Sequence, residues 1–266
     1  MGLIRILILP VLLTLLSCGC VSTNYNLATN RQEYTMTSTE KEVNMGRKLA
    51  KKVNSEIGLV QDNKMQERVS RIGKRLVEVC DRKEIVYSFS AVKGDEVNAF
   101  SLPGGYVFVN EGLIKKTHSD DELAAVLAHE IAHVAARHSV KRFESGIGAQ
   151  ILEIATIAAG RKTSLTQGVG MASLATQLAY SREDELAADR LGVRYMEKAG
   201  FDPKAMLTFL EMMEEQEQYK RDYIPEGITR PRNASTHPFW SDRIKAVKEE
   251  IFGVADYVDY LNTTNN

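Results

Sequence analysis

The chain has 266 residues, of which 44% are hydrophobic and 26% charged, and its formal net charge is −1. This is the composition of an ordinary globular protein, and the chain is long enough to bury one substantial core. A near-zero net charge without a basic cluster argues against nucleic-acid binding, so we expect no nucleic-acid partner. The sequence contains no internal repeat.

The first 17 residues have the features of a secretory signal, with Arg5 near the start and an apolar stretch after it. The stretch ends in Leu15-Leu16-Ser17-Cys18, which resembles the lipobox of bacterial lipoproteins. Cleavage before Cys18 would leave that cysteine to carry the lipid. Cys20 is a weaker alternative, because Ser17 and not an aliphatic residue stands three positions upstream of it. A plain transmembrane anchor is disfavoured, because the apolar stretch is short for spanning a bilayer.

The residue after the modified cysteine is Gly19 and not the aspartate associated with inner-membrane retention. The pattern therefore resembles outer-membrane sorting, and we expect a lipoprotein on the periplasmic face of a bacterial envelope. The apolar segment 147–160 is too short to span and includes Gln150 and Glu153. If Cys18 carries lipid, Cys20 and Cys80 are the remaining cysteines, and no sequence feature supports a bond between them.

The polar composition of residues 18–39, rich in Asn, Thr and Ser, predicts a flexible tether. We expect the folded domain to occupy residues 40–253 and a C-terminal tail to occupy residues 254–266. Apolar periodicity within the domain predicts two amphipathic helices, then a small sheet, then a mainly helical remainder. The helices are expected near residues 40–57 and 62–80, and the strands at residues 85–90 and 106–109.

A capping box, formed by Ser119 as N-cap and Glu122 three residues later, predicts the start of another helix. The apolar run that follows contains no Gly or Pro and is apolar nearly all round, so this helix must be buried. His129, Glu130 and His133 lie in this run. Their burial would carry a desolvation cost if they had no partner.

The pentapeptide His129-Glu130-Ile131-Ala132-His133 resolves this conflict if it binds a metal ion. Residues four apart lie on one helix face, so the two imidazoles can converge on a single ion. Glu130 can then reach a water on that ion and act as a general base. The alternative is a helix that carries two incidental histidines, which the buried setting disfavours.

Zinc needs a third protein ligand, and a later helical segment offers Glu185 and Asp189 four residues apart. Glu185 can complete a site of two histidines and one glutamate, and Asp189 can accept the other ring N–H of a zinc-bound histidine. A competing ligand is Glu183, which lacks an acidic or amide residue four positions on. The alternative for these carboxylates is a solvated helix face paired with Arg182 and Arg190.

These motifs resemble a family of zinc metallopeptidases that includes the CaaX prenyl endopeptidase, HtpX-type proteases and soluble periplasmic lipoprotein proteases. Its members share the HExxH helix, an ExxxD segment and an upstream Asn-Ala-Phe-x-x-Pro-Gly-Gly stretch, which begins here at Asn98. Ser235-Thr236-His237-Pro238, followed by Arg243, extends the resemblance, which covers roughly residues 40–252. The chain lacks the membrane spans of the integral-membrane branch, which disfavours a prenyl protease.

The resemblance implies a zincin-like, mainly α-helical α+β domain with a small sheet beside the HExxH helix. It implies one Zn²⁺ per chain on His129, His133 and Glu185, with Glu130 as the general base. It also implies that Asp189 contacts a histidine ligand on the side away from the zinc. It also implies roles for His237 and Arg243 near the substrate or the open zinc position.

The run of aromatic and β-branched residues after the Pro-Gly-Gly turn predicts a strand. If it is an edge strand beside the metal, it can pair with the substrate backbone and present the scissile carbonyl. An ordinary strand that only packs on the helix is the alternative. The expected substrate-binding residues are Gly104, Gly105, Tyr106, Val107 and Phe108.

His237 precedes Pro238 in a predicted loop, where a histidine packed in the core would be unusual. It can donate a hydrogen bond to the developing oxyanion, or occupy the open zinc position in a resting state. The segment 218–233 leads into it and is expected to border the site, although a solvated helix and loop is the simpler interpretation of residues 212–225. Residues 160–170 interrupt the helical pattern and can form a lid.

Two further histidines are predicted to lie on the surface. His118 precedes the capping box, and His138 lies five residues beyond His133, which turns it well off the metal face.

Together these features predict a zinc metalloendopeptidase that consists of a protease domain alone. By resemblance, its substrates are unfolded or misassembled cell-envelope proteins, which implies a role in protein quality control. The alternative is a chaperone-like or scaffolding envelope lipoprotein whose metal site is structural or blocked.

Overall fold

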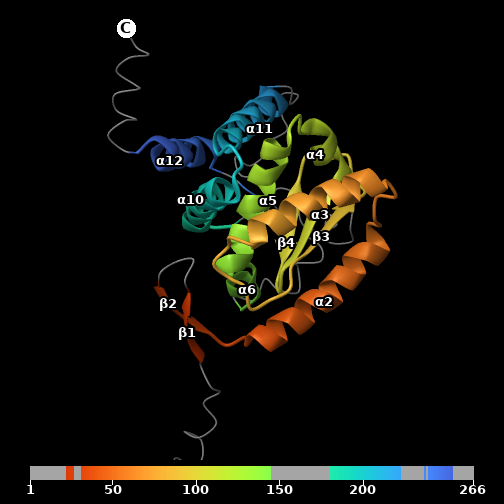
Figure 1. Ribbon diagram of the computed structural model, residues 1–266, viewed down its shortest axis with the longest axis vertical. Helices are drawn as coiled ribbons and strands as arrows, with labels where there is room; N and C mark the ends of the chain where they lie inside the picture. Colours follow the sequence, from red (N-terminus) through yellow and green to blue (C-terminus); the bar gives the residue numbers. More distant parts are fainter. Residues whose placement is uncertain (1–21, 27–30, 145–179, 223–236, 238, 254–266) are drawn as a thin grey trace, which may run out of the picture.

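The computed structural model describes residues 22–26, 31–144, 180–222, 237 and 239–253. Within these residues the chain is mainly helical, with a small sheet at its centre (Figure 1), which confirms the predicted fold class. The strands are β1 Ser22–Asn26, β2 Arg31–Thr35, β3 Ser88–Val92, β4 Ala99–Leu102 and β5 Tyr106–Asn110. The helices are α2 Thr39–Glu56, α3 Asn63–Val77, α4 Glu111–Lys116, α5 Asp120–Ala135, α6 His138–Arg142, α10 Arg182–Ala199, α11 Lys204–Asp222 and α12 Trp240–Phe252.

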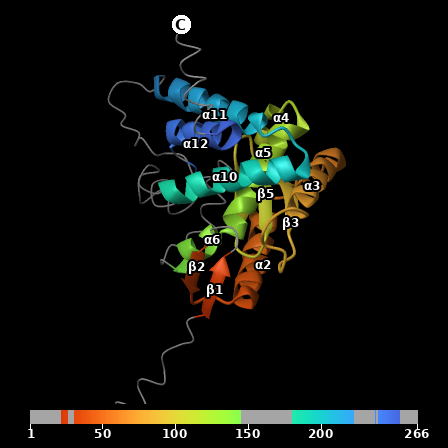
Figure 2. The ribbon, with the colours of Figure 1, turned by 60° about the vertical axis from the view of Figure 1, so that its left-hand side comes forward.

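Strands β1 and β2 form an antiparallel hairpin within residues predicted to be a flexible tether. The polar composition of this segment did not predict the hairpin, because strand prediction relies on β-branched and aromatic side chains whereas backbone hydrogen bonds form the ladder. The hairpin lies at the α6 end of the molecule (Figures 1 and 2). The chain just after it is held there by Arg137, whose Nη2 donates to Thr37 O at 2.6 Å.

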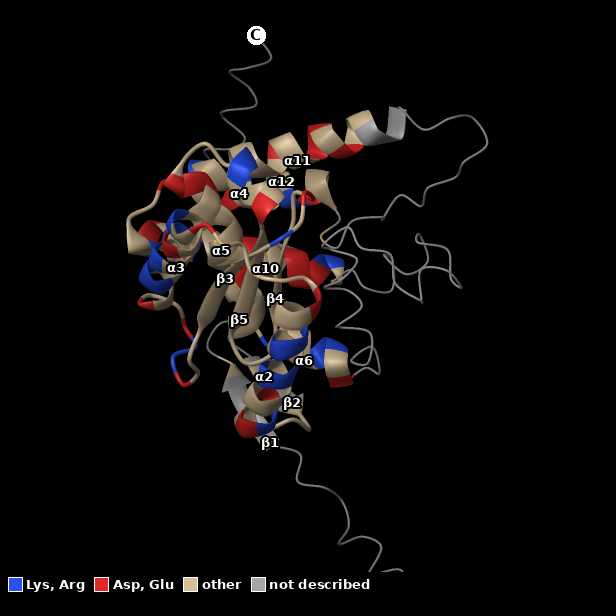
Figure 3. Cartoon of the chain, turned by 90° about the vertical axis from the view of Figure 1, so that its right-hand side faces the viewer, with Lys and Arg blue, Asp and Glu red and all other residues tan. Residues whose placement is uncertain are grey.

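Helices α2 and α3 lie close to their predicted positions, and local capping explains where each begins. Ser38 Oγ accepts from Lys41 N at the start of α2. Asp62 Oδ1 accepts from Lys64 N and Met65 N at the start of α3. Acidic and basic side chains are interspersed along α2 and α3, whereas β3, β4 and β5 carry none (Figure 3).

The central sheet has the strand order β3-β5-β4, in which β3 runs parallel and β4 antiparallel to β5. The prediction that residues 106–109 form a strand is correct, but the prediction that this strand lies at an edge is wrong. Strand β5 is the central strand of the sheet, because it is hydrogen-bonded to β3 on one side and to β4 on the other. The edge strand next to α5 is β4, which the sequence did not reveal.

Helix α5 runs through the middle of the fold, with α3, α10 and α11 packed around it (Figure 1). Its side chains from Leu123 to Ala135 are all buried. A close approach between α10 and α5 depends on Gly192, because a Cβ there would lie 3.3 Å from His129 N and 2.7 Å from Met206 Cε. This contact brings the second helix of carboxylates against the helix that carries the histidines.

A buried ionic cluster holds the carboxyl end of α5. Glu42 on α2 is 1% exposed and contacts Arg82 Nη2 at 2.8 Å and Arg137 Nη2 at 3.2 Å. Arg82 Nη1 also donates to Val134 O, in the last turn of α5, at 3.0 Å. No helix among the described residues is both long enough and apolar enough to cross a membrane.

Candidate metal centre

Helix α5 supplies three polar side chains to a buried point in the core. Ser119 is the N-cap as predicted, because its Oγ accepts from Glu122 N at 3.1 Å. The Glu122 carboxylate accepts from His118 N at 2.7 Å and not from the Ser119 N–H that a capping box would use. His129, Glu130 and His133, which follow on this helix, are 6%, 2% and 0% exposed. Their burial follows from the apolar helix on which they lie, and so they need partners.

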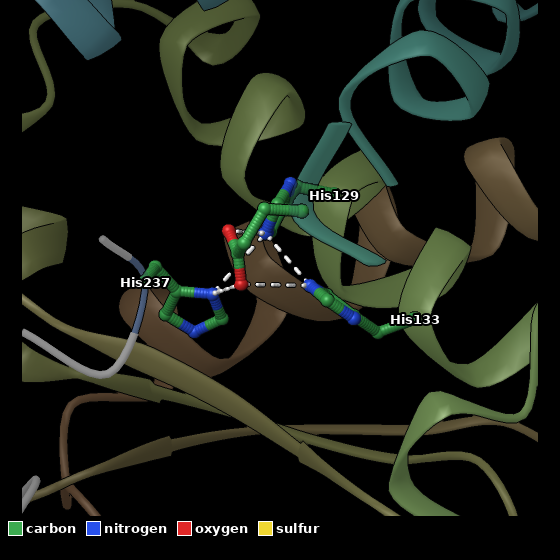
Figure 4. A group of neighbouring side chains, drawn as sticks. His129, His133 and His237 are labelled. Atoms are coloured by element: carbon green, nitrogen blue, oxygen red, sulfur yellow. Dashed lines mark hydrogen bonds and ion pairs between the residues drawn. The ribbon is translucent and has the colours of Figure 1, made fainter. Parts of the chain in front are cut away.

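Helix α10 brings Glu185 to the two histidines of α5, and His237 approaches from the segment before α12. One ligand atom from each of His129, His133, Glu185 and His237 lies within 4.8 Å of all the others. His129 Nε2 and His133 Nε2 are 3.0 Å apart, and His237 Nδ1 lies 2.9 Å from Glu185 Oε1. Figure 4 shows the three imidazoles turned toward one another around the carboxylate.

This donor set fits a zinc ion in both chemistry and spacing. Imidazole nitrogens and a carboxylate oxygen are ordinary zinc ligands, and ligands about 2.1 Å from a tetrahedral ion lie about 3.4 Å from one another. His129 Nε2 to Glu185 Oε2 is 3.4 Å, and His133 Nε2 to Glu185 Oε1 is 3.5 Å. The competing Glu183 is exposed and is not in the group.

Glu130 lies beside the group without belonging to it. Its Oε1 is 3.5 Å from His237 Nε2. Its Oε2 is buried and has no hydrogen-bond partner among the described residues. A buried carboxylate oxygen without a partner has the position and the free lone pair that a base acting on a nearby water requires.

The other ring nitrogen of His129 is held by Asp189, which in turn is clamped by Arg243. His129 Nδ1 lies 2.8 Å from Asp189 Oδ1, and Arg243 Nε and Nη2 donate to the two Asp189 oxygens at 2.7 Å each. Burial alone would raise the pKa of Asp189, but the guanidinium of Arg243 lowers it to about 2. Asp189 therefore stays ionised and accepts the His129 N–H.

Arg243 was expected near the substrate or the open zinc position, and its side chain instead faces the carboxylates behind the group. It is 3% exposed, and its Nη1 lies 3.1 Å from Glu185 Oε2. Burial would raise the pKa of Glu185, but the charges of His237 and Arg243 hold it well below its usual value. Arg243 thus keeps both buried acids of α10 ionised.

The prediction that His138 lies on the surface is wrong, whereas His118 is exposed as predicted. Helix α5 ends at Ala135, and Arg137 takes a left-handed conformation with φ of 57° before α6 begins. This turn brings the His138 ring into contact with the His133 ring, and the two Nδ1 atoms are 2.8 Å apart. His138 is 2% exposed, and burial lowers the pKa of both rings to about 3, so both are neutral.

An aromatic ring covers the remaining face of His133. The Tyr180 ring is stacked on it with centroids 3.9 Å apart and an interplanar angle of 20°. Tyr180 Oη lies 3.0 Å from Ser139 Oγ, which fixes the tyrosine from its other end. The sequence offered no signal for this contact, because Tyr180 and His133 meet only in the folded chain.

The predicted substrate-binding residues lie in the turn before β5 and in β5 itself, which has neighbours on both sides. The sheet edges are β3 and β4, and β4 is the edge that packs against α5. Because Asn110 N donates to Asn98 O, the alternation of an antiparallel ladder turns the N–H and C=O groups of Ala99 and Ser101 outward. Ser101 O accepts from Ser139 Oγ at 3.4 Å.

Several sequence predictions lie outside the described residues. These are the lipidation of Cys18, the pairing of Cys20, the lid at residues 160–170, the C-terminal tail, and most of the segment 218–233.

Residues 63–251 match the model of a protein family described as Peptidase family M48. The beta-barrel assembly-enhancing protease of Escherichia coli is 28% identical over 218 residues, which cover 78% of this chain and 43% of the relative. The putative enzyme of the same name in Vibrio cholerae is 31% identical, covering 76% of this chain and 43% of the relative. The mitochondrial metalloendopeptidase OMA1 of Schizosaccharomyces pombe is 32% identical, covering 83% of this chain and 64% of the relative. The chain thus spans less than half the length of the two bacterial relatives.

Proposed function

This chain belongs to peptidase family M48, and from that premise we propose that it is a zinc-dependent metalloendopeptidase with one zinc ion per chain. One observation carries the proposal. The ligand atoms of His129, His133, Glu185 and His237 converge within 4.8 Å, and Glu130 stands beside them with a buried oxygen that has no described partner. A solvated helix face or a pair of incidental histidines would not need this arrangement.

The protein groups divide the chemistry of peptide hydrolysis between them. Zinc, when bound, would polarise the peptide carbonyl and lower the pKa of water toward neutrality. Glu130 Oε2 takes the proton of the attacking water and later returns it to the leaving amine. Asp189 holds the His129 ring by its Nδ1–H, and Arg243 keeps Asp189 ionised while it does so.

We assign His237 to the resting state as a fourth ligand. Its Nδ1 lies 2.9 Å from Glu185 Oε1 and 3.3 Å from His129 Nε2, which is the spacing of a group member. The alternative, a hydrogen-bond donor to the oxyanion, needs the ring to face a substrate and not the other ligands. In this arrangement His237 must leave before a substrate carbonyl can approach, so the resting enzyme is weakly active.

We propose that the substrate backbone pairs with β4. The N–H and C=O groups of Ala99 and the N–H of Ser101 point away from β5, whereas Ser101 O accepts from Ser139 Oγ. Strand β4 also packs against the helix that carries the histidines. Pairing by main-chain hydrogen bonds gives affinity for extended segments with little regard to sequence. This supports a preference for unfolded chains, because a folded substrate does not offer a free extended segment.

The substrates and the location follow from the printed names of relatives and from the leader. We propose that the chain acts on unfolded or misassembled envelope proteins and is anchored by lipid on Cys18 at the periplasmic face of a bacterial outer membrane. The support is the name beta-barrel assembly-enhancing protease among bacterial relatives and the lipobox-like Leu15-Leu16-Ser17-Cys18. The membrane, through this anchor, and the unfolded substrates are the proposed partners.

Hydrolysis of a denatured protein by the mature chain tests this function. The wild type should cleave it, a chelator should stop cleavage, and added zinc should restore it. The chaperone-like alternative predicts no cleavage in any arm, while aggregation of the denatured protein is still suppressed. Recovery of cleavage with zinc would exclude that alternative, and cleavage that resists the chelator would refute the metal-dependent mechanism.

A further inference from the structure

His133 has a second buried histidine as its partner on the side away from the metal group. His138 Nδ1 lies 2.8 Å from His133 Nδ1, and His138 Nε2 lies 3.1 Å from Asp184 Oδ1. His133 and His138 are 0% and 2% exposed, so the contact between their rings is shielded from water. The result is a chain of contacts that runs from Asp184 through His138 to His133.

Counting protons along this chain of contacts leaves one arrangement that permits metal binding. A nitrogen that binds a metal offers its lone pair, so a neutral His133 that binds through Nε2 carries its proton on Nδ1. That proton lies between the two Nδ1 atoms, so His138 Nδ1 must be the acceptor. His138 then carries its own proton on Nε2, where it donates to the carboxylate of Asp184.

The opposite arrangement would block the site. If His138 carried its proton on Nδ1, then His133 Nδ1 would have to accept it and His133 Nε2 would be protonated. That N–H would point at His129 Nε2, 3.0 Å away, and its lone pair would be lost to a metal. The tautomer of His138 therefore selects the tautomer of His133.

We propose that His138, oriented by Asp184, is a positioning residue that presets His133 for metal binding through Nε2. The inference rests on the proposed function, since it takes His133 to be a zinc ligand. It also makes the two histidines of α5 unlike each other, because the Nδ1 of His129 contacts a carboxylate directly and the Nδ1 of His133 contacts a second imidazole ring.

The local structure keeps both partners in place. The left-handed Arg137 ends the path of α5 and starts α6 at His138, directly under His133. Asp184 lies in the first turn of α10, where its N–H donates to the N-cap Ser181 Oγ at 3.1 Å. The same helix carries Glu185, so one rigid element holds a proposed ligand and the end of the chain of contacts.

The test is the zinc dissociation constant of the mature protein, measured by competition with a chromophoric chelator. His138→Phe keeps a ring but removes the acceptor, and should weaken zinc binding about 10- to 100-fold. His138→Asn carries a carbonyl oxygen near the place of Nδ1, and should recover most of the affinity. The zinc dissociation constant of Asp184→Asn should lie between those of the wild type and His138→Phe. The matched controls are His118→Phe and Glu183→Gln, two exposed positions where binding should not change.

Nitrogen-15 NMR of the histidine rings gives a second readout. It is made on the wild-type protein, so it does not depend on whether a variant folds. In the zinc-free protein His133 should be protonated on Nδ1 and His138 on Nε2, and zinc should leave His138 unchanged. A His138 protonated on Nδ1, or a His138→Phe variant that binds zinc as tightly as wild type, overturns the inference. If the wild type bound no zinc, the proposed function itself would fail, and this inference with it.

Discussion

Replacement of Glu42 by glutamine probes how the carboxyl end of the metal-binding helix is held. Glu42 is 1% exposed and accepts from Arg82 Nη1 at 2.9 Å, from Arg82 Nη2 at 2.8 Å, and from Gly104 N at 3.0 Å. Arg137 Nη2 lies 3.2 Å from its other oxygen. One carboxylate thus contacts two buried guanidiniums and accepts the backbone N–H of Gly104 in the turn before β5.

The cost of Glu42→Gln follows from these contacts. The amide oxygen can still accept on one side, but the amide N–H₂ faces two guanidinium donors on the other. The change removes at least two charge-assisted hydrogen bonds and the carboxylate that pairs with Arg137, while Arg82 keeps its second partner, Glu84, at 2.8 Å. Breaking a buried ion pair from one side costs about 3–5 kcal/mol in the free energy of unfolding. For a domain of this size that is a fall in Tm of roughly 6–20 °C.

Urea unfolding followed by circular dichroism measures the loss. Glu40→Gln is the matched control, because Glu40 lies in the same first turn of α2 but is exposed. The control should change the free energy of unfolding by less than about 0.5 kcal/mol. If Glu42→Gln cost no more than the control, the buried cluster would not hold α5 as described.

Three further predictions concern the site and its support. His237→Ala should raise the rate of hydrolysis of a denatured protein several-fold if His237 blocks the resting site, and a fall in rate would favour the oxyanion role instead. Gly192→Ala places a Cβ 2.7 Å from Met206 Cε and 3.3 Å from His129 N, so it should cost about 1–3 kcal/mol of stability by thermal denaturation and weaken zinc binding. The pKa of Asp120 is lowered by hydrogen bonds from Arg68 and Arg71, so its contribution to stability is present above pH 3.8 and lost as the pH falls below it. Asp120→Asn should therefore be less stable than wild type at pH 7, by less than about 1 kcal/mol because the pair is partly exposed, and this difference should shrink as the pH falls through the lowered pKa of Asp120.

The parts of the fold that could be predicted from the sequence rest on local interactions. The capping box at Ser119 and the unbroken apolar run after it define α5 without reference to the rest of the chain. The spacing of Glu185 and Asp189 likewise places both on one face of a helix before any partner is known. Long-range contacts then bring the two helices together, helped by Gly192.

The parts that the sequence did not reveal depend on tertiary contacts or on unusual local geometry. The order of strands in the sheet is a tertiary property, so the run at β5 was predicted to lie at an edge, whereas β4 lies at the edge and β5 lies between β3 and β4. The end of α5 has no Gly or Asn to mark it in the sequence, and Arg137 adopts the left-handed conformation that those residues usually provide. His138 was misplaced for that reason, since a helix continued past Ala135 would have turned it outward.

The zinc-dependent peptidase activity is tested most directly by Glu130→Gln, with zinc content and hydrolysis of a denatured protein measured on the same sample. Glu130 lies outside the ligand group, so the variant should bind one zinc ion per chain as the wild type does. Its rate of hydrolysis should be lower by about 100- to 10,000-fold, the usual contribution of a general base. Hydrolysis at the wild-type rate by zinc-loaded Glu130→Gln would contradict the assignment of the base and the mechanism built on it.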